Sequence, residues 1–232
     1  MVAPFISPVI AFHSIRPNKG QDIYAFDPDV FEEIVLYINT KYGFSDLDTV
    51  SQHIQNETPP KRQFLISFDD GYRDNYEIVL PILEKYNIRG IFFILPQYIG
   101  KKNVWDRRAQ VYLQHMNHHQ LLDLSRRGHT IGSHGLTHNS FLKLSDKDLK
   151  KEFVQSKEML EQLIGDKIEY FAYPYGDSND HIGQIGRQFY SLLFSTNKNT
   201  SHDWRTSHYA QIPRFNLRAD IDVLTIKSNI DL

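Results

Sequence analysis

The chain has 232 residues, of which 41% are hydrophobic and 23% are charged, and it contains no cysteine. This composition is typical of one globular domain with a sizeable core. Without cysteine, disulfides and thiolate ligands are excluded, and only histidines and carboxylates remain to bind a metal. A net charge of −2 gives no support to nucleic-acid or anionic-membrane binding. No apolar run approaches the roughly 20 residues needed for a membrane span.

The N-terminal segment MVAPFISPVIAFHS lacks the basic residues that begin a secretory signal. Its apolar part, residues 8–13, is better interpreted as a buried strand. We therefore expect a cytoplasmic protein, or an extracellular or cell-envelope protein if a signal peptide has been removed. The sequence leaves the oligomeric state open.

Strand and helix patterns alternate along the rest of the chain. After the first strand, a helix is predicted from a cap at Asp27, with Pro28 in its first turn, to Gly43. Further strands are predicted at residues 64–68, 91–95, 130–134, 169–173 and 191–195, and helices at residues 75–86, 117–127 and 145–164. Pro81 should kink the first of these three helices or begin a first turn. The repeated order of strand then helix predicts a parallel sheet with outer helices.

The first chemical signal is the run FLISFDDG at residues 64–71, where an apolar strand ends on two adjacent carboxylates, Asp69 and Asp70. Successive side chains of a strand point to opposite faces. Both acids can therefore reach one site only if the chain turns there, and Gly71 permits such a turn. The run predicts two carboxylates with different roles at the end of one strand.

Two further patterns follow along the chain. SHGLTH carries His134 and His138, and FAYPYG places a Pro-aromatic-Gly turn after a strand. One carboxylate and two neutral imidazoles suit Zn²⁺ and related ions, and three protein ligands leave a position open for water, whose pKa the metal lowers. A second carboxylate can then act as general base. These residue types predict a metal-dependent hydrolase with Asp70, His134 and His138 as ligands and Asp69 as base.

In this order and combination, the three motifs resemble those of carbohydrate esterase family 4, the NodB-type polysaccharide deacetylases, over about residues 9–218. The resemblance implies a distorted, TIM-like (β/α) barrel of about seven strands, the NodB homology fold, with residues 1–232 forming one catalytic domain. It implies the same ligands and base, and an oxyanion hole to which the backbone N–H of Tyr175 contributes. The implied metal is Zn²⁺, with Co²⁺, Ni²⁺, Fe²⁺ or Mn²⁺ as alternatives.

The chain departs from the family pattern at two functional positions. Many members begin the third motif with an arginine that orients the base, but Ala172 stands there, and Arg214 is the predicted replacement that holds Asp69. The usual C-terminal Leu-His motif, which supplies the general acid, is also missing, because no histidine follows His208. The run VIAFHS resembles the N-terminal Tyr-His strand of the biofilm-polysaccharide deacetylases. His13 is therefore the predicted acid, with a carboxylate or carbonyl fixing its tautomer.

The predicted function is hydrolysis of an N-acetyl or other N-acyl group on an amino sugar or N-acetylated glycan. Two other classes stay open. A 2-His-1-carboxylate iron oxygenase uses the same ligand types, but its usual all-β setting conflicts with the alternation of strands and helices. A non-enzymatic glycan-binding relative would bind the sugar without turnover. The sequence does not decide the acyl group, the sugar, or a polymeric against a small substrate.

Two segments are expected to border the site. Residues 97–116 are predicted to form an excursion over its mouth. The polar stretch NKNTSHDWRTSH, which contains Asp203 and Trp204, is predicted to form a mobile rim.

Overall fold

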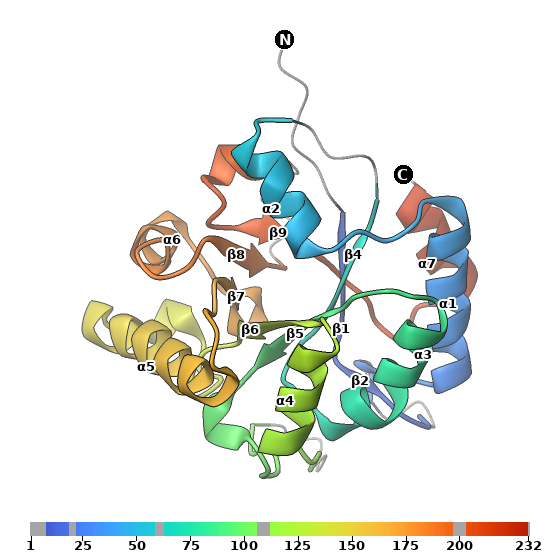
Figure 1. Ribbon diagram of the computed structural model, residues 1–232, viewed down its shortest axis with the longest axis horizontal. Coiled ribbons are helices and arrows are strands. Elements are labelled where there is room, and N and C mark those ends of the chain that lie inside the picture. Colours follow the sequence, from blue (N-terminus) through green and yellow to red (C-terminus); the bar gives the residue numbers. More distant parts are fainter. Residues whose placement is uncertain (1–7, 19–21, 59–62, 106–111, 197–202, 232) are drawn as a thin grey trace.

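The computed structural model describes residues 8–18, 22–58, 63–105, 112–196 and 203–231, which form a barrel of parallel strands surrounded by helices (Figure 1). The barrel strands are β1 (Val9–Phe12), β4 (Leu65–Phe68), β5 (Ile91–Ile94), β6 (Thr130–Ser133), β7 (Tyr170–Ala172), β8 (Leu192–Ser195), β9 (Ile212–Pro213) and β10 (Phe215–Asn216). They form one sheet in the order β10-β1-β4-β5-β6-β7-β8-β9. A separate parallel pair consists of β2 (Ser14–Ile15) and β3 (Ala25–Phe26).

The barrel closes through one short segment near the C-terminus. β9 and β10 lie at opposite ends of the sheet order, yet only Arg214 separates them in the chain. β9 pairs with β8 and β10 pairs with β1, both in parallel. The predicted distorted (β/α) barrel is confirmed, and its sheet has eight strands where about seven are predicted, because the closing segment consists of two short strands. β1 pairs with β4, so His13 and Asp69 follow neighbouring strands.

Helices cover the outside of the barrel. They are α1 (Pro28–Lys41), α2 (Leu47–Gln55), α3 (Leu80–Lys85), α4 (His118–Arg126), α5 (Asp146–Ile164), α6 (Asp180–Gly186) and α7 (Val223–Asp231). A π-helical segment, η1 (Asn75–Val79), precedes α3. The described residues also form four 3₁₀ turns: η2 (Pro96–Tyr98), η3 (Phe141–Lys143), η4 (Pro174–Gly176) and η5 (Trp204–Ser207). Residues Leu47 and Val50 of α2 pack with Val9 and Leu65, the first residues of their strands. α2 therefore covers the end of the barrel where the strands begin.

Alternate strand residues pack on two different cores, as the two-residue period of a strand requires. In β5, Phe92 and Ile94 belong to the large cluster beneath the helices, whereas Ile91 and Phe93 belong to the smaller cluster that fills the barrel. β8 repeats this alternation. The barrel interior is therefore a packed core, and the chemistry lies at the ends of the strands.

Most predicted helices appear close to their expected bounds, with two differences in detail. The segment predicted at residues 75–86 divides into η1 and α3, and Pro81 lies in the first turn of α3. Asp27 precedes α1, but its side chain makes no capping bond and instead accepts a hydrogen bond from the Asn18 backbone N–H. α5 lies within one residue of its predicted bounds; Ser145 caps its start, and Gly165 follows its end in the left-handed conformation.

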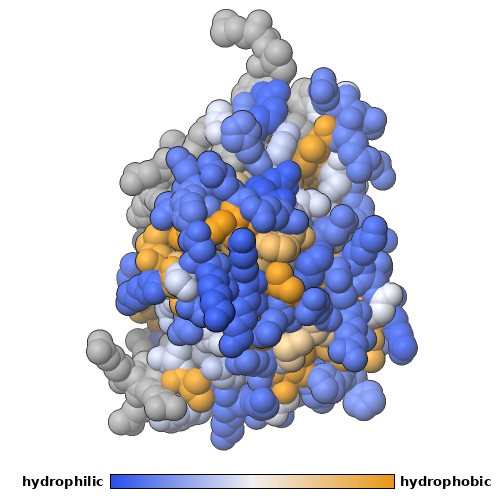
Figure 2. Space-filling view, turned by 90° about the vertical axis from the view of Figure 1, so that its left-hand side faces the viewer, coloured by the Kyte–Doolittle hydropathy of each residue, from blue (hydrophilic) through white to orange (hydrophobic). Residues whose placement is uncertain are grey.

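Within the described ranges, the helices are all too short or too polar to cross a bilayer. Figure 2 shows the face formed on the side of α5 and α6, which is largely hydrophilic. Its hydrophobic residues form small, separate groups, so this face presents no broad apolar surface.

Candidate active site

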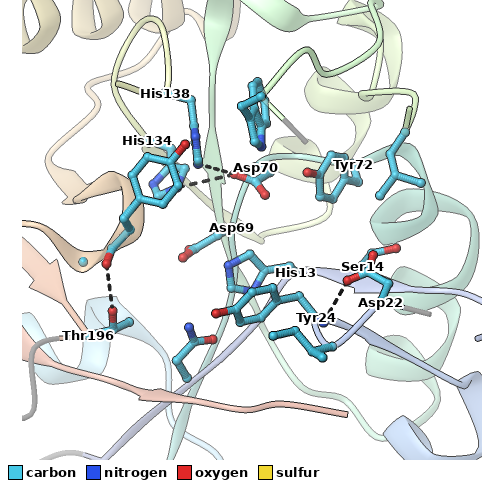
Figure 3. Close-up of a pocket in the computed structure, with 16 residues that line it drawn as sticks. His13, Ser14, Asp22, Tyr24, Asp69, Asp70, Tyr72, His134, His138 and Thr196 are labelled. Carbon is cyan, nitrogen blue, oxygen red and sulfur yellow. Dashed lines mark hydrogen bonds and ion pairs between the residues drawn. The ribbon is translucent and has the colours of Figure 1, made fainter. Parts of the chain in front are cut away.

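Three side chains that follow β4 and β6 converge at one point (Figure 3). Their potential ligand atoms all lie within 4.8 Å of one another, and the residues are Asp70, His134 and His138. Asp70 Oδ1 is 3.2 Å from Nε2 of His138 and 3.5 Å from Nε2 of His134. All three residues are buried. The structure thus brings together the three predicted ligands.

The turn that joins the two acids begins at Asp70 itself. Its φ is 69°, and Gly71 follows with φ 73°. In a continuing strand, Asp69 and Asp70 would point to opposite faces. Two consecutive left-handed residues redirect the chain, and both side chains line the same pocket. A left-handed non-glycine residue costs about 1 kcal/mol or more, which the surrounding packing must offset.

The surroundings of the three side chains fit a divalent cation. His134 Nδ1 lies 2.8 Å from the carbonyl oxygen of Ala172, so Nδ1 donates a proton there and the lone pair of Nε2 faces Asp70. Asp70 Oδ1 is buried and accepts no hydrogen bond from any described residue, although two imidazole nitrogens lie beside it. A buried carboxylate oxygen that faces an imidazole lone pair is unfavourable without a cation between them.

Burial and charge set the protonation states that a cation requires. Burial lowers the pKa of His134 to about 4, against the opposing effect of the carboxylates of Asp69 and Asp70. Burial by itself raises the pKa of Asp70, but the neighbouring histidines, His138 first and then His13 and His134, more than offset this, and the net pKa lies below the usual value. His134 is therefore neutral and Asp70 ionised at neutral pH, as metal ligands must be.

Asp69 has a different environment, because it is bound by Arg214. Nη1 and Nη2 of Arg214 donate to Oδ1 and Oδ2 of Asp69 at 2.6 and 2.7 Å. Nη1 also donates to Ser67 Oγ at 3.2 Å, and the guanidinium lies over the Phe93 ring. Burial alone raises the pKa of Asp69, but the Arg214 charge reverses this and holds the pKa below its usual value. The structure therefore provides an ionised, oriented carboxylate in the same pocket as Asp70, His134 and His138.

His13 follows β1 and lines the same pocket as the two acids (Figure 3). Its ring lies 4.9 Å from the Tyr24 ring, and its carbonyl oxygen accepts a 2.8 Å hydrogen bond from Asn75 Nδ2. Nδ1 is buried and has no hydrogen-bond partner within the described part of the chain. The structure thus places His13 in the pocket of the three candidate ligands, and within the described residues its Nδ1 lacks the carboxylate or carbonyl partner expected for the ring.

The cavity at these strand ends has a volume of about 470 Å³ and aromatic walls. Trp105 stacks on the His138 ring at a centroid distance of 4.3 Å, and Tyr175 meets the same ring edge-on at 4.6 Å. Tyr175 adopts φ 60°, and the residue is 58% exposed. Flat apolar walls around a few polar groups are typical of small-molecule sites. A sugar ring is one ligand that this shape can accommodate.

The predicted excursion is described in two parts, residues 97–105 and 112–116, and residues 106–111 lie outside the described residues. These parts contribute Trp105 and Leu113 to the pocket wall. The residue pattern gave no signal for Trp105, because its role depends on how this irregular segment folds.

The prediction of a mobile rim is wrong for Trp204, and residues 197–202 of the same stretch lie outside the described residues. Trp204 is only 1% exposed and packs edge-on against Phe194 of the barrel interior. The Asp203 side chain accepts a hydrogen bond from the Arg205 N–H at the start of η5. A polar stretch can therefore anchor a buried indole, which charge patterning alone does not reveal.

Asp74 and Asn75, which no sequence pattern singled out, hold the segment that carries His13. Asp74 Oδ2 accepts a hydrogen bond from Ser14 Oγ, and Asp74 Oδ1 accepts one from Asn75 Nδ2 at 2.8 Å. Together with the bond from Asn75 to the His13 carbonyl, these contacts tie the segment after β1 to the segment after β4. Their position just beyond the Asp-Asp-Gly run is the signal that could have identified them.

Asp74 should make stability depend on pH. Burial raises the pKa of Asp74 to about 7, although its hydrogen bonds to Ser14 and Ile15 act in the opposite direction. Because this value exceeds the ordinary 3.8, the folded state binds more protons between about pH 4 and 7, and the free energy of unfolding falls as the pH rises through this window. Relative to Asp74→Asn, the wild type should lose at least about 1 kcal/mol over that range.

Urea unfolding of both proteins, metal-free, at pH 4.5 and 7.5 would measure this difference. Other titrating groups contribute equally to both proteins and cancel. Parallel pH profiles for the two proteins would contradict the prediction.

The fold and the site can now be compared with known proteins. Residues 56–190 match the family model described as polysaccharide deacetylase. The chain is 30% identical over 184 residues to the poly-beta-1,6-N-acetyl-D-glucosamine N-deacetylase of Staphylococcus aureus (strain MRSA252), an alignment that covers 77% of this chain and 62% of that protein. It spans about three fifths of the length of the curated relatives that it matches.

Two solved structures share the fold. The Streptococcus pyogenes deacetylase PplD in complex with acetate matches with a TM-score of 0.80 and 20% identity, over 98% of this chain and 99% of that one. IcaB from Ammonifex degensii matches with a TM-score of 0.81 and 21% identity, over 98% and 97%. The family model covers more than half of the sequence, and the barrel agrees over nearly all of it. This chain therefore belongs to the polysaccharide deacetylase family.

Proposed function

We propose that the protein is a metal-dependent N-deacetylase that removes an acetyl or similar acyl group from an amino sugar in a glycan, with residues 1–232 acting as one catalytic domain. The observation that carries this proposal is the meeting, in one pocket, of the cluster Asp70, His134 and His138 with a second carboxylate, Asp69, that is bound by arginine. The name of the S. aureus relative supports a β-1,6-linked N-acetylglucosamine polymer as the first substrate to test.

Asp70, His134 and His138 would hold the cation, for which Zn²⁺ is the first choice and Co²⁺, Ni²⁺, Fe²⁺ or Mn²⁺ are alternatives. A bound cation of this kind stabilises negative charge on oxygen and lowers the pKa of water. The Ala172 carbonyl keeps the His134 ring in the tautomer and orientation that this role needs.

The chain's own residues would perform the proton transfers. Asp69, ionised and oriented by Arg214, accepts a proton from water as the water oxygen adds to the amide carbon. The backbone N–H of Tyr175 donates to the resulting oxyanion. His13 then gives a proton to the amine nitrogen as the C–N bond breaks. The first products are a carboxylic acid, which ionises to a carboxylate by releasing a proton to water, and a free amino sugar. The proton on Asp69 and the one lost from His13 are then exchanged with solvent, which restores both groups.

The two alternative classes fit the structure less well. The parallel barrel is not the all-β setting that a 2-His-1-carboxylate oxygenase usually has, and such an enzyme needs no second, arginine-bound carboxylate. A glycan-binding protein needs neither the buried carboxylate of Asp69 nor its orientation by Arg214. Hydrolysis uses both features.

The test is to incubate the metal-loaded full chain, with and without oxygen, with N-acetylated substrates and to measure released acetate and new amines. The panel should contain N-acetylglucosamine, chitin oligomers and β-1,6-linked N-acetylglucosamine oligomers. Acetate release without oxygen is the expected result and would exclude the oxygenase. Binding of these sugars with no acetate release would instead indicate the glycan-binding relative.

The cytoplasmic location stays a prediction, which cell fractionation would test.

Replacing His13 by alanine should leave the metal bound but lower kcat about 10²- to 10⁴-fold, the usual contribution of a positioned acid or base. The alkaline limb of the bell-shaped pH profile should disappear, because that limb reports the general acid. The measurements are metal content and kcat from pH 5 to 10. The control is His119→Ala, which alters an exposed histidine of α4. An unchanged alkaline limb in His13→Ala would assign the acid elsewhere.

A further inference from the structure

Glu152 is a buried carboxylate of α5 that does not line the active-site cavity. It is only 5% exposed. Its Oε2 accepts hydrogen bonds from the backbone N–H groups of Leu136 and Thr137, at 2.6 and 3.1 Å, and its Oε1 accepts one from the Thr137 hydroxyl. All these donors belong to the loop between His134 and His138. The carboxylate therefore binds the short connection between two proposed metal ligands.

This connection has a backbone that needs support. Gly135 and His138 adopt φ values of 81° and 60°. A Cβ atom at Gly135 would lie 3.1 Å from Glu152 Oε2, so the loop packs tightly on the carboxylate. One turn further along α5, Ser156 Oγ accepts a 2.8 Å hydrogen bond from Ser133 Oγ, just before His134. Two successive turns of α5, at Glu152 and at Ser156, therefore bind the chain around this loop.

The Glu152 carboxylate is bound by uncharged donors. Among the described residues, no lysine, arginine or histidine forms an ion pair with it, and its side chain is bound by the two N–H groups and the hydroxyl. Burying a carboxylate without a counter-ion costs free energy, which only well-placed donors offset. The loop can therefore leave this conformation only by removing donors from a buried charge.

We propose that Glu152 is a positioning residue that fixes the His134–His138 loop in the conformation required for metal binding. This inference rests on the proposed metal site. Glu152 contacts neither ring, so it acts through the loop backbone: its three accepted bonds set the spacing and direction of the two imidazoles before the cation arrives. Weakening them should let the two rings separate and lower the metal affinity.

The experiment compares the metal-free full chain with Glu152→Gln, which keeps the side-chain shape but presents an NH₂ group to at least one of the loop donors. Thr137→Val keeps both backbone bonds to Glu152 and removes the hydroxyl bond, together with the bond that this hydroxyl accepts from the exposed Asn139. Glu158→Gln alters an exposed position of the same helix as a matched control. Calorimetry gives the Kd for Zn²⁺, the visible absorption of the Co²⁺ form reports the ligand geometry, and thermal unfolding with and without metal gives the stability.

We expect Glu152→Gln to bind Zn²⁺ about 10- to 100-fold more weakly, as is typical when support of a metal ligand is lost, and to alter the Co²⁺ spectrum. Thr137→Val should have a smaller effect in the same direction, and Glu158→Gln none. A merely structural role would lower the Tm by the same amount with and without metal and leave the Kd unchanged.

Wild-type affinity and an unchanged spectrum in both Glu152→Gln and Thr137→Val would overturn this inference alone. If the wild type bound metal but released no acetate, the proposed deacetylation would fail while the role of Glu152 would still be decided by the Kd values. If the wild type bound no metal, both proposals would be wrong.

Discussion

The double variant His134→Ala, His138→Ala is expected to lose bound metal and activity together while keeping its fold. Two of the three candidate ligands are removed, and one carboxylate cannot retain a divalent ion at a site of this kind. The barrel should persist, because both histidines lie beyond the end of β6 and outside the two hydrophobic clusters. Metal analysis after dialysis, circular dichroism and acetate release would measure the three outcomes.

The matched control for this experiment is His118→Ala, His119→Ala, which removes two exposed histidines from the start of α4. It should keep both metal and turnover. A chelator should likewise abolish acetate release by the wild type, and added Zn²⁺ or Co²⁺ should restore this activity. One equivalent of metal retained by the His134, His138 double variant would refute the ligand assignment.

The second large effect is expected for Asp69→Asn, which should keep the metal and lose turnover by about 10²- to 10⁴-fold. A neutral amide cannot accept the proton from water, yet it can still accept one hydrogen bond from Arg214. Because the buried Arg214 charge loses its ionic partner, the variant should also be less stable, by up to about 3–5 kcal/mol. Metal content, kcat and the urea midpoint should therefore be measured on the same preparation.

Asp70→Asn provides the contrast, since it changes the neighbouring carboxylate by the same chemistry. It should lower the metal content itself, because an amide oxygen is a weaker ligand than a carboxylate. Equal metal loss in Asp69→Asn and Asp70→Asn would show that the two roles are wrongly divided. Full turnover in Asp69→Asn would show that Asp69 is not the base.

The helices and strands that were predicted correctly are specified by signals within their own segments of the sequence. α5 has a serine cap, a long amphipathic repeat and a terminal glycine, all within one continuous segment. The strands that carry the motifs are short apolar runs bounded by turn residues. By contrast, α2, α6 and α7 have only seven to nine residues each. So few turns give little helical periodicity, and these helices were not predicted. α4 is equally short, with nine residues, but Gly128 marks the end of its segment, and it was predicted.

By itself, the sequence determined the residue types of the site and their order along the strands, because Asp69, Asp70 and the two histidines are fixed by short motifs at strand ends. It could nominate Arg214 as a partner for Asp69. Only the tertiary structure decided that they meet, since the barrel closes through the segment between β9 and β10, 145 residues after Asp69 in the chain.

The other contacts decided by tertiary structure are also distant in sequence or depend on irregular backbone. They include the left-handed turn at Asp70, the Ala172 carbonyl that orients His134, the buried Trp204, and the hold of Glu152 on the histidine loop. Residue periodicity and turn preferences depend only on residues that are neighbours in the sequence. The meeting of side chains from different strands depends on closure of the whole barrel, which no local pattern encodes.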